Sequence, residues 1–258
     1  MKRSIIYTLL ALASLSLLTT CNNHSPNDQE PEPTDTEEPQ EIIVEPVDFL
    51  SEAQYDQLIV EIVYMEGFKL NANSIYLLAS FLEERIHKSG GISIISKAIP
   101  SEGKANYAIA DLQALEVQYR QHLPIDKTLS AWIAIVDTDY AENKDTVKTL
   151  GIPYATSSIA LFGKSIQEFS GGEEQPSPHV LESSVLKHLF GHLLGLVNKG
   201  TPMLTNHLDT QHDNHCSNNF CLMHYTAATS LFYVNFPGGN VPSLREQCLQ
   251  DLEGNGGK

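Results

Sequence analysis

The sequence predicts an α/β domain with a mixed, mostly parallel sheet, and three observations support this fold class. Apolar runs of strand length alternate with longer segments whose apolar residues recur at helical spacing, in the order strand, helix, strand, helix, strand, strand, helix. Strands separated by helices tend to pair in parallel, whereas strands joined by a short connection tend to pair antiparallel. The segment that carries these elements, residues 49–258, is long enough to bury one core.

The first four elements alternate between strand and helix. Residues 58–65 (LIVEIVYM) are a β-branched, apolar run of strand length. Residues 71–88 place four apolar side chains at helical spacing and end at a glycine pair. A second strand is expected at residues 92–95, and a second helix at residues 108–122 ends near Pro124.

Two strands and a helix complete the predicted domain. Residues 129–136 (LSAWIAIV) and residues 155–162 are apolar runs of strand length. The short connection between them predicts an antiparallel pair, which makes the sheet mixed. The last clear helix is expected at residues 180–197.

The charge of the chain excludes one large class of function. The 258 residues include 32 Asp and Glu against 16 Lys and Arg, so the formal net charge is -16. So acidic a chain repels phosphate backbones at long range, and no cluster of basic residues forms a local exception. We therefore expect no binding to nucleic acid.

The first 20 residues have the layout of a secretory signal peptide. Lys2 and Arg3 precede an apolar run, residues 5–18, which is shorter than the roughly 20 residues that a bilayer-spanning helix needs. The last residue of the run begins the sequence Leu-Thr-Thr-Cys, residues 18–21, which resembles the lipobox of bacterial lipoproteins. Cys21 is therefore the expected lipidation site. The alternative is an ordinary signal peptide in which Cys21 is incidental.

Residues 21–48 are expected to form an acidic, proline-rich tether. Residues 22–48 hold nine acidic residues and five prolines with no Lys or Arg, so this stretch cannot bury enough apolar surface to fold. An acidic segment after a lipidated cysteine also resembles surface-export signals of Gram-negative lipoproteins. We therefore expect a lipid-anchored protein of the bacterial cell envelope, held at the outer membrane and exposed at the cell surface.

Two histidines on the last predicted helix form a candidate metal site. His188 and His192 are four residues apart, so both imidazoles lie on one face of the helix and can reach one tetrahedral metal ion. Such a pair also arises by chance on many helices. Here Gly195 follows three residues later, where a glycine allows the chain to break and bring back a third ligand.

The sequence from this helix onward resembles the zinc site of the metzincin metallopeptidases. The matching residues are His188, His192, Gly195, His215, Cys216, Cys221 and Met223. The His-Cys pair followed by Cys and Met is similar to the archaemetzincin branch, and residues 55–250 are also similar to the "membrane metalloprotease" lipoproteins of the Bacteroidetes. The resemblance implies an active-site helix, a small C-terminal subdomain and peptide-bond hydrolysis by zinc-bound water.

The same resemblance implies roles for individual residues. His188 and His192 would be zinc ligands, Gly195 the turn glycine, and Met223 the methionine of the turn beneath the metal. Residues 150–154 and the segment containing Ser157 and Ser158 would be the edge strand along which a peptide substrate pairs. Tyr225, near that turn, would either donate a hydrogen bond to the transition state or serve in packing.

Two positions depart from the family pattern. Leu189 follows His188 where the family carries the glutamate that accepts a proton from the zinc-bound water, so we expect impaired hydrolysis. Asn198 stands where the third ligand is usual, and an insertion, residues 199–214, follows it. His215 is the expected third ligand because it keeps the His-Cys pairing.

The insertion offers further ligands of its own. His207 and Asp209 are the alternatives to His215, and a site with only two histidines is the remaining reading.

Besides Cys21, the three cysteines of the chain are Cys216, Cys221 and Cys248, an odd number that cannot all pair within one chain. A local disulfide between the first two, a disulfide that includes Cys248, and a second, structural zinc site are all open. Archaemetzincins hold such a zinc with four cysteines. Here Asp251 stands at the fourth position, where a carboxylate oxygen could act as ligand.

The expected function is therefore that of a surface-anchored zinc metallopeptidase-like protein that acts on peptides or proteins. Two alternatives come from other classes. One is a peptide- or protein-binding module that keeps the cleft without catalysis, and the other is a metal-binding surface protein that uses its histidine-rich insertion.

Overall fold

The computed structural model describes residues 43–144, 146–237 and 239–258. The signal peptide, Cys21 and most of the predicted tether lie outside the described residues. The folded part begins earlier than residue 49, because Val44 is buried and a short helix, α1 (Pro46–Leu50), follows it. The end of the predicted tether, residues 43–48, therefore belongs to the domain.

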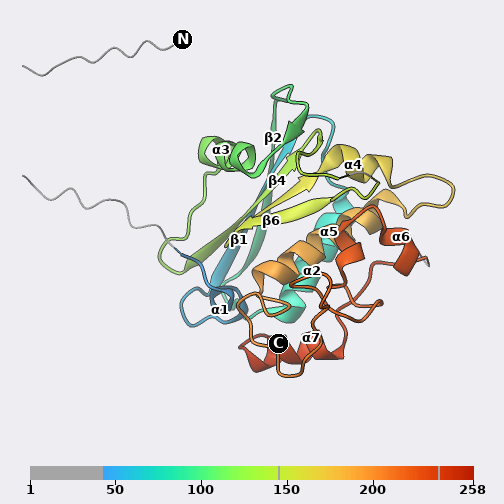
Figure 1. Ribbon diagram of the computed structural model, residues 1–258. Helices are drawn as coiled ribbons and strands as arrows, with labels where there is room; N and C mark the ends of the chain where they lie inside the picture. Colours follow the sequence, from blue (N-terminus) through green and yellow to red (C-terminus); the bar gives the residue numbers. More distant parts are fainter. Residues whose placement is uncertain (1–42, 145, 238) are drawn as a thin grey trace, which may run out of the picture. The chain divides into compact units, whose positions relative to one another are not determined.

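The centre of the domain is a five-stranded sheet of the mixed, mostly parallel kind that the sequence predicts. In spatial order the strands are β2 (Gly91–Ile99), β1 (Gln57–Met65), β4 (Thr128–Val136), β7 (Ser158–Phe162) and β6 (Gly151–Ala155). The first four are parallel to one another, and β6 alone is antiparallel to its neighbour β7. The two edge strands are thus β2 and β6 (Figure 1).

The pairing of the last two strands differs from the prediction. The segment expected as one strand antiparallel to β4, residues 155–162, instead contains β7, which is parallel to β4. The strand antiparallel to β7 is β6, which precedes that segment and ends at Ala155. Ser157 and Ser158 therefore lie at the start of an inner strand, where both are buried, and not on the sheet edge as expected. The edge that a peptide can reach on this side is β6.

Helices cover both faces of the sheet. α2 (Ala72–Arg85) and α5 (Pro178–Leu193) pack on one face, and α3 (Ile109–Tyr119) packs on the other (Figure 1). Alternate residues of β4 enter two separate cores, with Ile133 on the face of α5 and Trp132 on the face of α3. Because both faces are buried, β4 lacks regular polar alternation, and its residues 131–136 are a continuous apolar run.

The remaining elements are short. They are β3 (Asn106–Tyr107), β5 (Asp139–Tyr140), α4 (Gly163–Glu168), a 3-10 turn η1 (Tyr225–Ala228), α6 (Phe232–Asn235) and α7 (Glu246–Gly254). The last three follow α5, and they form a small C-terminal region on the side of α5 away from the sheet (Figure 1). Among the described residues, no helix combines the length and the apolar character needed to cross a bilayer.

Candidate metal centre

Helix α5 places two imidazoles side by side in the interior. His188 and His192 are buried, and their Nε2 atoms lie 3.0 Å apart. The Nδ1 atom of His188 donates to the carbonyl oxygen of Leu222 at 2.8 Å, and that of His192 donates to the carbonyl oxygen of Leu196 at 3.0 Å. With both Nδ1 atoms protonated, two unshared electron pairs face each other across 3.0 Å, an arrangement that a cation between them would stabilise.

The helix ends directly after the second histidine. α5 stops at Leu193, four residues before the predicted end, because Gly195 adopts a φ of +84°. A Cβ atom at this position would lie 2.2 Å from the Thr201 hydroxyl oxygen, so only glycine fits. Asn198, which stands at the family's usual third-ligand position, is exposed and lies outside the histidine cluster.

The insertion ends in a tight loop that returns the chain to α5. We call residues 207–217 the ligand hairpin, because Asp209 N donates to His215 O at 2.8 Å and Ser217 N donates to His207 O at 2.9 Å. The hairpin stacks the His215 ring on that of His188 at a centroid distance of 5.2 Å. One ring nitrogen of each of His188, His192 and His215 lies within 4.8 Å of the others. The structure thus brings together the three expected ligands.

The donor set fits a zinc ion. Three nitrogens at about 2.0–2.1 Å from a tetrahedral zinc are separated by about 3.3 Å, and the one measured pair is separated by 3.0 Å. Burial lowers the pKa of His188 to about 3 and also lowers the pKa of His192 and His215. All three imidazoles are therefore neutral at pH 7, the form in which they bind metal.

The same pKa shifts predict how the metal-free protein responds to acid. A histidine whose pKa in the folded state is below its unfolded value of about 6.5 takes up a proton more readily after unfolding. The free energy of unfolding should therefore fall as the pH falls from about 6.5 towards 3, by on the order of 1 kcal/mol per pH unit for His188 alone. Urea unfolding at pH 7 and pH 5, after a chelator has removed any bound metal, measures this fall in the free energy of unfolding. A His188→Gln variant that keeps the full slope would contradict this assignment.

Met223 supports the floor of the site. It is fully buried, and a Cβ atom added at Gly191, between the two helix ligands, would lie 2.3 Å from its sulfur. The neighbouring residue Leu222 accepts the His188 Nδ1 hydrogen bond. The turn that carries Met223 therefore both packs beneath the helix and fixes the orientation of one ligand.

A pocket of about 380 Å³ opens over the three histidines. One wall is the edge strand β6, where Gly151 approaches α5 so closely that a Cβ atom would lie 2.7 Å from the Leu189 side chain. Leu189 lines the same pocket and is 1% exposed. The position at which the sequence resemblance implies a glutamate is thus occupied by an apolar side chain packed against the edge strand.

We call His188, His192 and His215 the triad, and one further imidazole of this pocket lies outside it. His212 Nδ1 donates to the carboxylate of Asp209 at 2.8 Å, and its ring stacks on Tyr225 at a centroid distance of 3.6 Å. His212 and Tyr225 both line the pocket. Asp209, expected as an alternative metal ligand, instead holds His212. With the Nδ1 atom protonated, the Nε2 atom of His212 is left as a hydrogen-bond acceptor.

A second cluster of ligand atoms, which we call the thiol cluster, lies in the C-terminal region. His207, Cys216 and Cys248 each offer an atom within 4.8 Å of the others, and all three side chains are buried. The Cys221 sulfur lies 3.5 Å from that of Cys248 and accepts backbone hydrogen bonds from Met223 and Arg245. All three cysteines are free thiols, so neither disulfide considered from the sequence is present among them.

Asp251 has a different place from the one expected. Its carboxylate accepts a hydrogen bond of 2.7 Å from His207 Nε2 and another of 2.7 Å from Leu204 N. His207 Nδ1 then faces the sulfurs, 3.3 Å from Cys216. The fourth donor beside the thiols is therefore His207, and Asp251 orients it, as carboxylates orient metal-binding histidines.

The sequence reasoning missed two features of these sites. One is the place of His207 in the thiol cluster, and the other is the contact between Asp209 and His212. The insertion is rich in histidine and aspartate, which indicates that potential ligands are present. The sequence does not indicate which of these side chains contact one another.

Comparisons with known proteins find similarity to solved structures alone. No family model and no curated protein matches the sequence. Among solved structures, the chain is similar to an archaemetzincin, a zinc-dependent peptidase and a metalloproteinase.

In particular, it is similar to archaemetzincin of Methanopyrus kandleri, with 15% identity and a TM-score of 0.49, over 78% of this chain and 96% of that one. It is also similar to a zinc-dependent peptidase of Methanocorpusculum labreanum, with 15% identity and a TM-score of 0.49, over 75% of this chain and 99% of that one. The similarity to metalloproteinase-II of Bacteroides fragilis has 14% identity and a TM-score of 0.40, over 78% of this chain and 55% of that one.

Proposed function

We propose that this chain is a lipid-anchored envelope protein whose folded domain is a zinc metallopeptidase-like domain with impaired hydrolysis. One observation carries the proposal: three neutral imidazoles, of which His188 and His192 are buried and His215 is half-buried, converge in a pocket that is bounded by an edge strand. A metal ion bound there would lie beside a backbone to which an extended peptide can pair.

The residues of the pocket have distinct roles in this function. His188, His192 and His215 would hold the zinc ion, which when bound polarises a peptide carbonyl and acidifies a water molecule. Strand β6 (Gly151–Ala155) orients the peptide through main-chain hydrogen bonds along its free edge. Tyr225 lines the pocket and offers a phenolic hydroxyl group.

The acceptor for a proton is the weak point of the site. Leu189 has no atom that can take a proton from water, and loss of a general base costs on the order of 10²–10⁴ in rate. His212, held by Asp209, is an acceptor in the same pocket and is the candidate for the residual activity.

Hydrolysis of peptides by the purified protein tests the proposal. A mixture of fluorogenic peptides should be cleaved slowly, and cleavage should stop with a chelator or with His192→Ala and return when zinc is added to the chelated wild type. Cleavage that persists in both would place the activity elsewhere.

The alternative function is a peptide- or protein-binding module without catalysis. Leu189 favours it, because the pocket and its metal ligands are kept while the proton acceptor at that position is replaced by an apolar contact. Peptide binding without cleavage by the zinc-loaded protein would support this alternative.

We further propose that the second cluster holds a structural zinc ion. Sulfurs at about 2.3 Å from a tetrahedral zinc lie about 3.8 Å apart, close to the 3.5 Å between Cys221 and Cys248. Hydrogen bonding with Cys216 lowers the pKa of the Cys221 thiol, and hydrogen bonding to these neighbours raises the pKa of Cys248. In the absence of metal, the neighbouring thiols thus favour ionisation of Cys221 and oppose ionisation of Cys248, whereas a zinc ion would stabilise every thiolate.

This second site predicts a graded loss of stability. Cys248→Ser should remove one zinc ion per chain and lower the melting temperature by about 10 °C or more, because structural zinc contributes directly to folding. Asp251→Asn should keep the ion but weaken its binding by about 10- to 100-fold, since Asp251 only orients His207. Zinc content and thermal unfolding measure both effects.

Glu253→Gln is the matched control, since Glu253 is exposed on the same helix, α7. If Cys248→Ser kept its full zinc content, the assignment would be wrong.

The proposed anchor can be tested separately. Cys21→Ala should release the protein from the membrane fraction of the producing cells, because lipid chains on this cysteine would supply the membrane affinity. Protease treatment of intact cells then tells whether the domain lies outside the outer membrane.

A further inference from the structure

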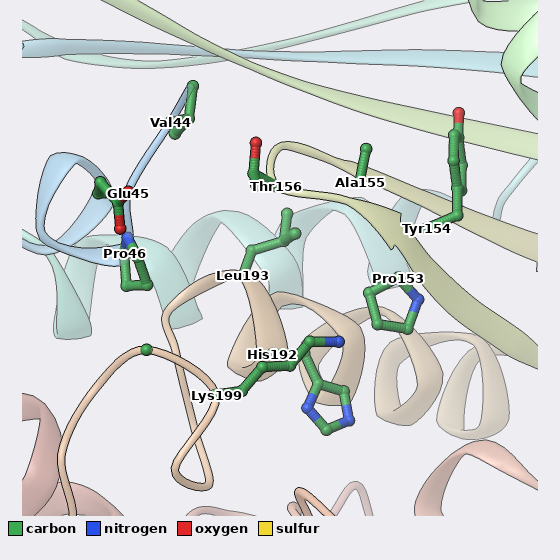
Figure 2. A pocket seen from close by; sticks show the side chains of 11 residues that line it. Val44, Glu45, Pro46, Pro153, Tyr154, Ala155, Thr156, His192, Leu193 and Lys199 are labelled. Carbon is green, nitrogen blue, oxygen red and sulfur yellow. The ribbon is translucent and has the colours of Figure 1, made fainter. Parts of the chain in front are cut away.

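A second hollow lies beside the histidine pocket along the edge strand. It has a volume of about 370 Å³ and is bounded by β6, by the end of α5 and by residues 44–46 (Figure 2). It shares Pro153 and His192 with the histidine pocket, which is lined by the other end of β6. A peptide paired with β6 would therefore pass from one hollow to the other.

A fixed turn delivers Lys199 to this hollow. Lys199 N donates to the carbonyl oxygen of Gly195 at 2.8 Å, and the next residue, Gly200, lies so close to Pro46 that a Cβ atom would be 2.7 Å from the proline ring. The Lys199 side chain extends past His192 towards Pro153 (Figure 2). Its backbone is thus held while its amino group reaches into the cleft next to a proposed zinc ligand.

The Lys199 ammonium group lacks an acidic counterpart in the part of the chain that the structure describes. The ion pairs formed there by lysines involve Lys104, Lys148 and Lys164. Lys199 is exposed at the mouth of the hollow, and partial desolvation there lowers its pKa with no carboxylate to counteract that effect. Glu45 also lines the hollow, but on its opposite wall (Figure 2). In a chain with a net charge of -16, a cation without a carboxylate beside the proposed metal site is a feature that a ligand can use.

We propose that Lys199 binds a carboxylate of the peptide that occupies the cleft, so that the domain selects acidic peptides. This inference rests on the proposed function and specifies its substrate class. The other walls of the hollow are largely apolar, formed by residues such as Val44, Pro153 and Leu193, so the ammonium group is the attractive contact for an anion there. The carboxylate can belong to an Asp or Glu side chain or to the C-terminus of the peptide.

Binding of defined peptides to the zinc-loaded protein tests the inference without relying on turnover. The probes are fluorescein-labelled octapeptides of Ala and Gln with an amidated C-terminus, in which one Glu is placed at each position in turn. Two further probes are the parent peptide with a free C-terminus and a set with Lys in place of Glu. Fluorescence anisotropy gives the dissociation constants.

We expect a carboxylate at one register to tighten binding about tenfold over the matched Gln peptide, the size of one charge-assisted hydrogen bond. The preference should weaken with added salt. It should vanish in Lys199→Met and reverse towards the Lys peptides in Lys199→Glu. The control is Lys97→Met, which removes an exposed lysine from β2, the opposite edge of the sheet. The preference for a carboxylate should be unchanged in this variant.

The probes also distinguish the source of the carboxylate and the fate of the proposed function. A gain confined to the free C-terminus identifies terminal recognition, and a gain confined to Glu identifies side-chain recognition. Equal binding of all probes by the wild type, or a preference that survives Lys199→Met, would overturn the inference. Selective binding without cleavage would refute the hydrolytic function alone, whereas cleavage without selectivity would refute the inference alone.

Discussion

Replacing His188 and His192 together with alanine should lower the zinc content of the purified protein from about two ions per chain to about one. The two imidazoles supply two of the three ligands in the first cluster, and their Nε2 atoms lie 3.0 Å apart. The thiol cluster does not include either residue, so its ion should stay. Elemental analysis of protein purified without added metal, with protein concentration from amino-acid analysis, gives the ratio.

His179→Ala is the matched control, because His179 lies on the same helix but outside both clusters. It should keep both ions. No zinc in the wild type, or an unchanged ratio in the double variant, would remove the histidine site and with it the metallopeptidase reading.

Leu189→Glu should raise kcat/KM for peptide hydrolysis by about 10²–10⁴, the usual contribution of a general base. Leu189 follows the first ligand on α5 and lines the pocket above the triad, so a carboxylate at this position would face the reacting water. The measurement is the initial rate on a quenched fluorescent peptide at equal zinc content. Leu189→Gln is the control, because glutamine is similar in size to glutamate but cannot act as a general base. This variant should keep the wild-type rate.

His212 supplies a second arm of the same experiment. If it accepts the proton in the wild type, His212→Ala should abolish the residual activity yet have little effect once glutamate stands at position 189. An inactive Leu189→Glu protein that binds zinc and folds normally would show that this domain has lost more than its base, and would favour the peptide-binding alternative.

The core of the fold could be predicted because its elements are dictated by local chemistry. β1 and β4 are buried on both faces and are mostly apolar, with Glu61 and Ser130 as their interior polar residues. The apolar residues of α2 form a stripe that a helix can bury on one side. The β6–β7 hairpin was harder. Pro153 sits in β6, and a proline in an apolar run weakens the signal for a strand, although an edge strand tolerates it.

The site was partly predictable for a different reason. Spacing along one helix fixes how His188 and His192 meet, and Gly195 marks the break that follows. Which residue of the insertion returns to them depends on the ligand hairpin, whose backbone hydrogen bonds join residues across the loop. No periodicity records such contacts, so His207, Asp209 and His215 stood as alternatives until the fold separated them.

The ligand hairpin gives the two clusters a shared scaffold. His215 belongs to the triad and the adjacent Cys216 to the thiol cluster, while His207 closes the other end of the same hairpin. An ion bound by the thiols would restrict the backbone that carries the third histidine, so the triad would form at a smaller entropic cost. Loading of the two ions should therefore be cooperative and reciprocal: occupancy of either raises the affinity of the other by the same factor. Zinc supply to the envelope would then produce mainly empty and fully loaded molecules, with few that hold a single ion.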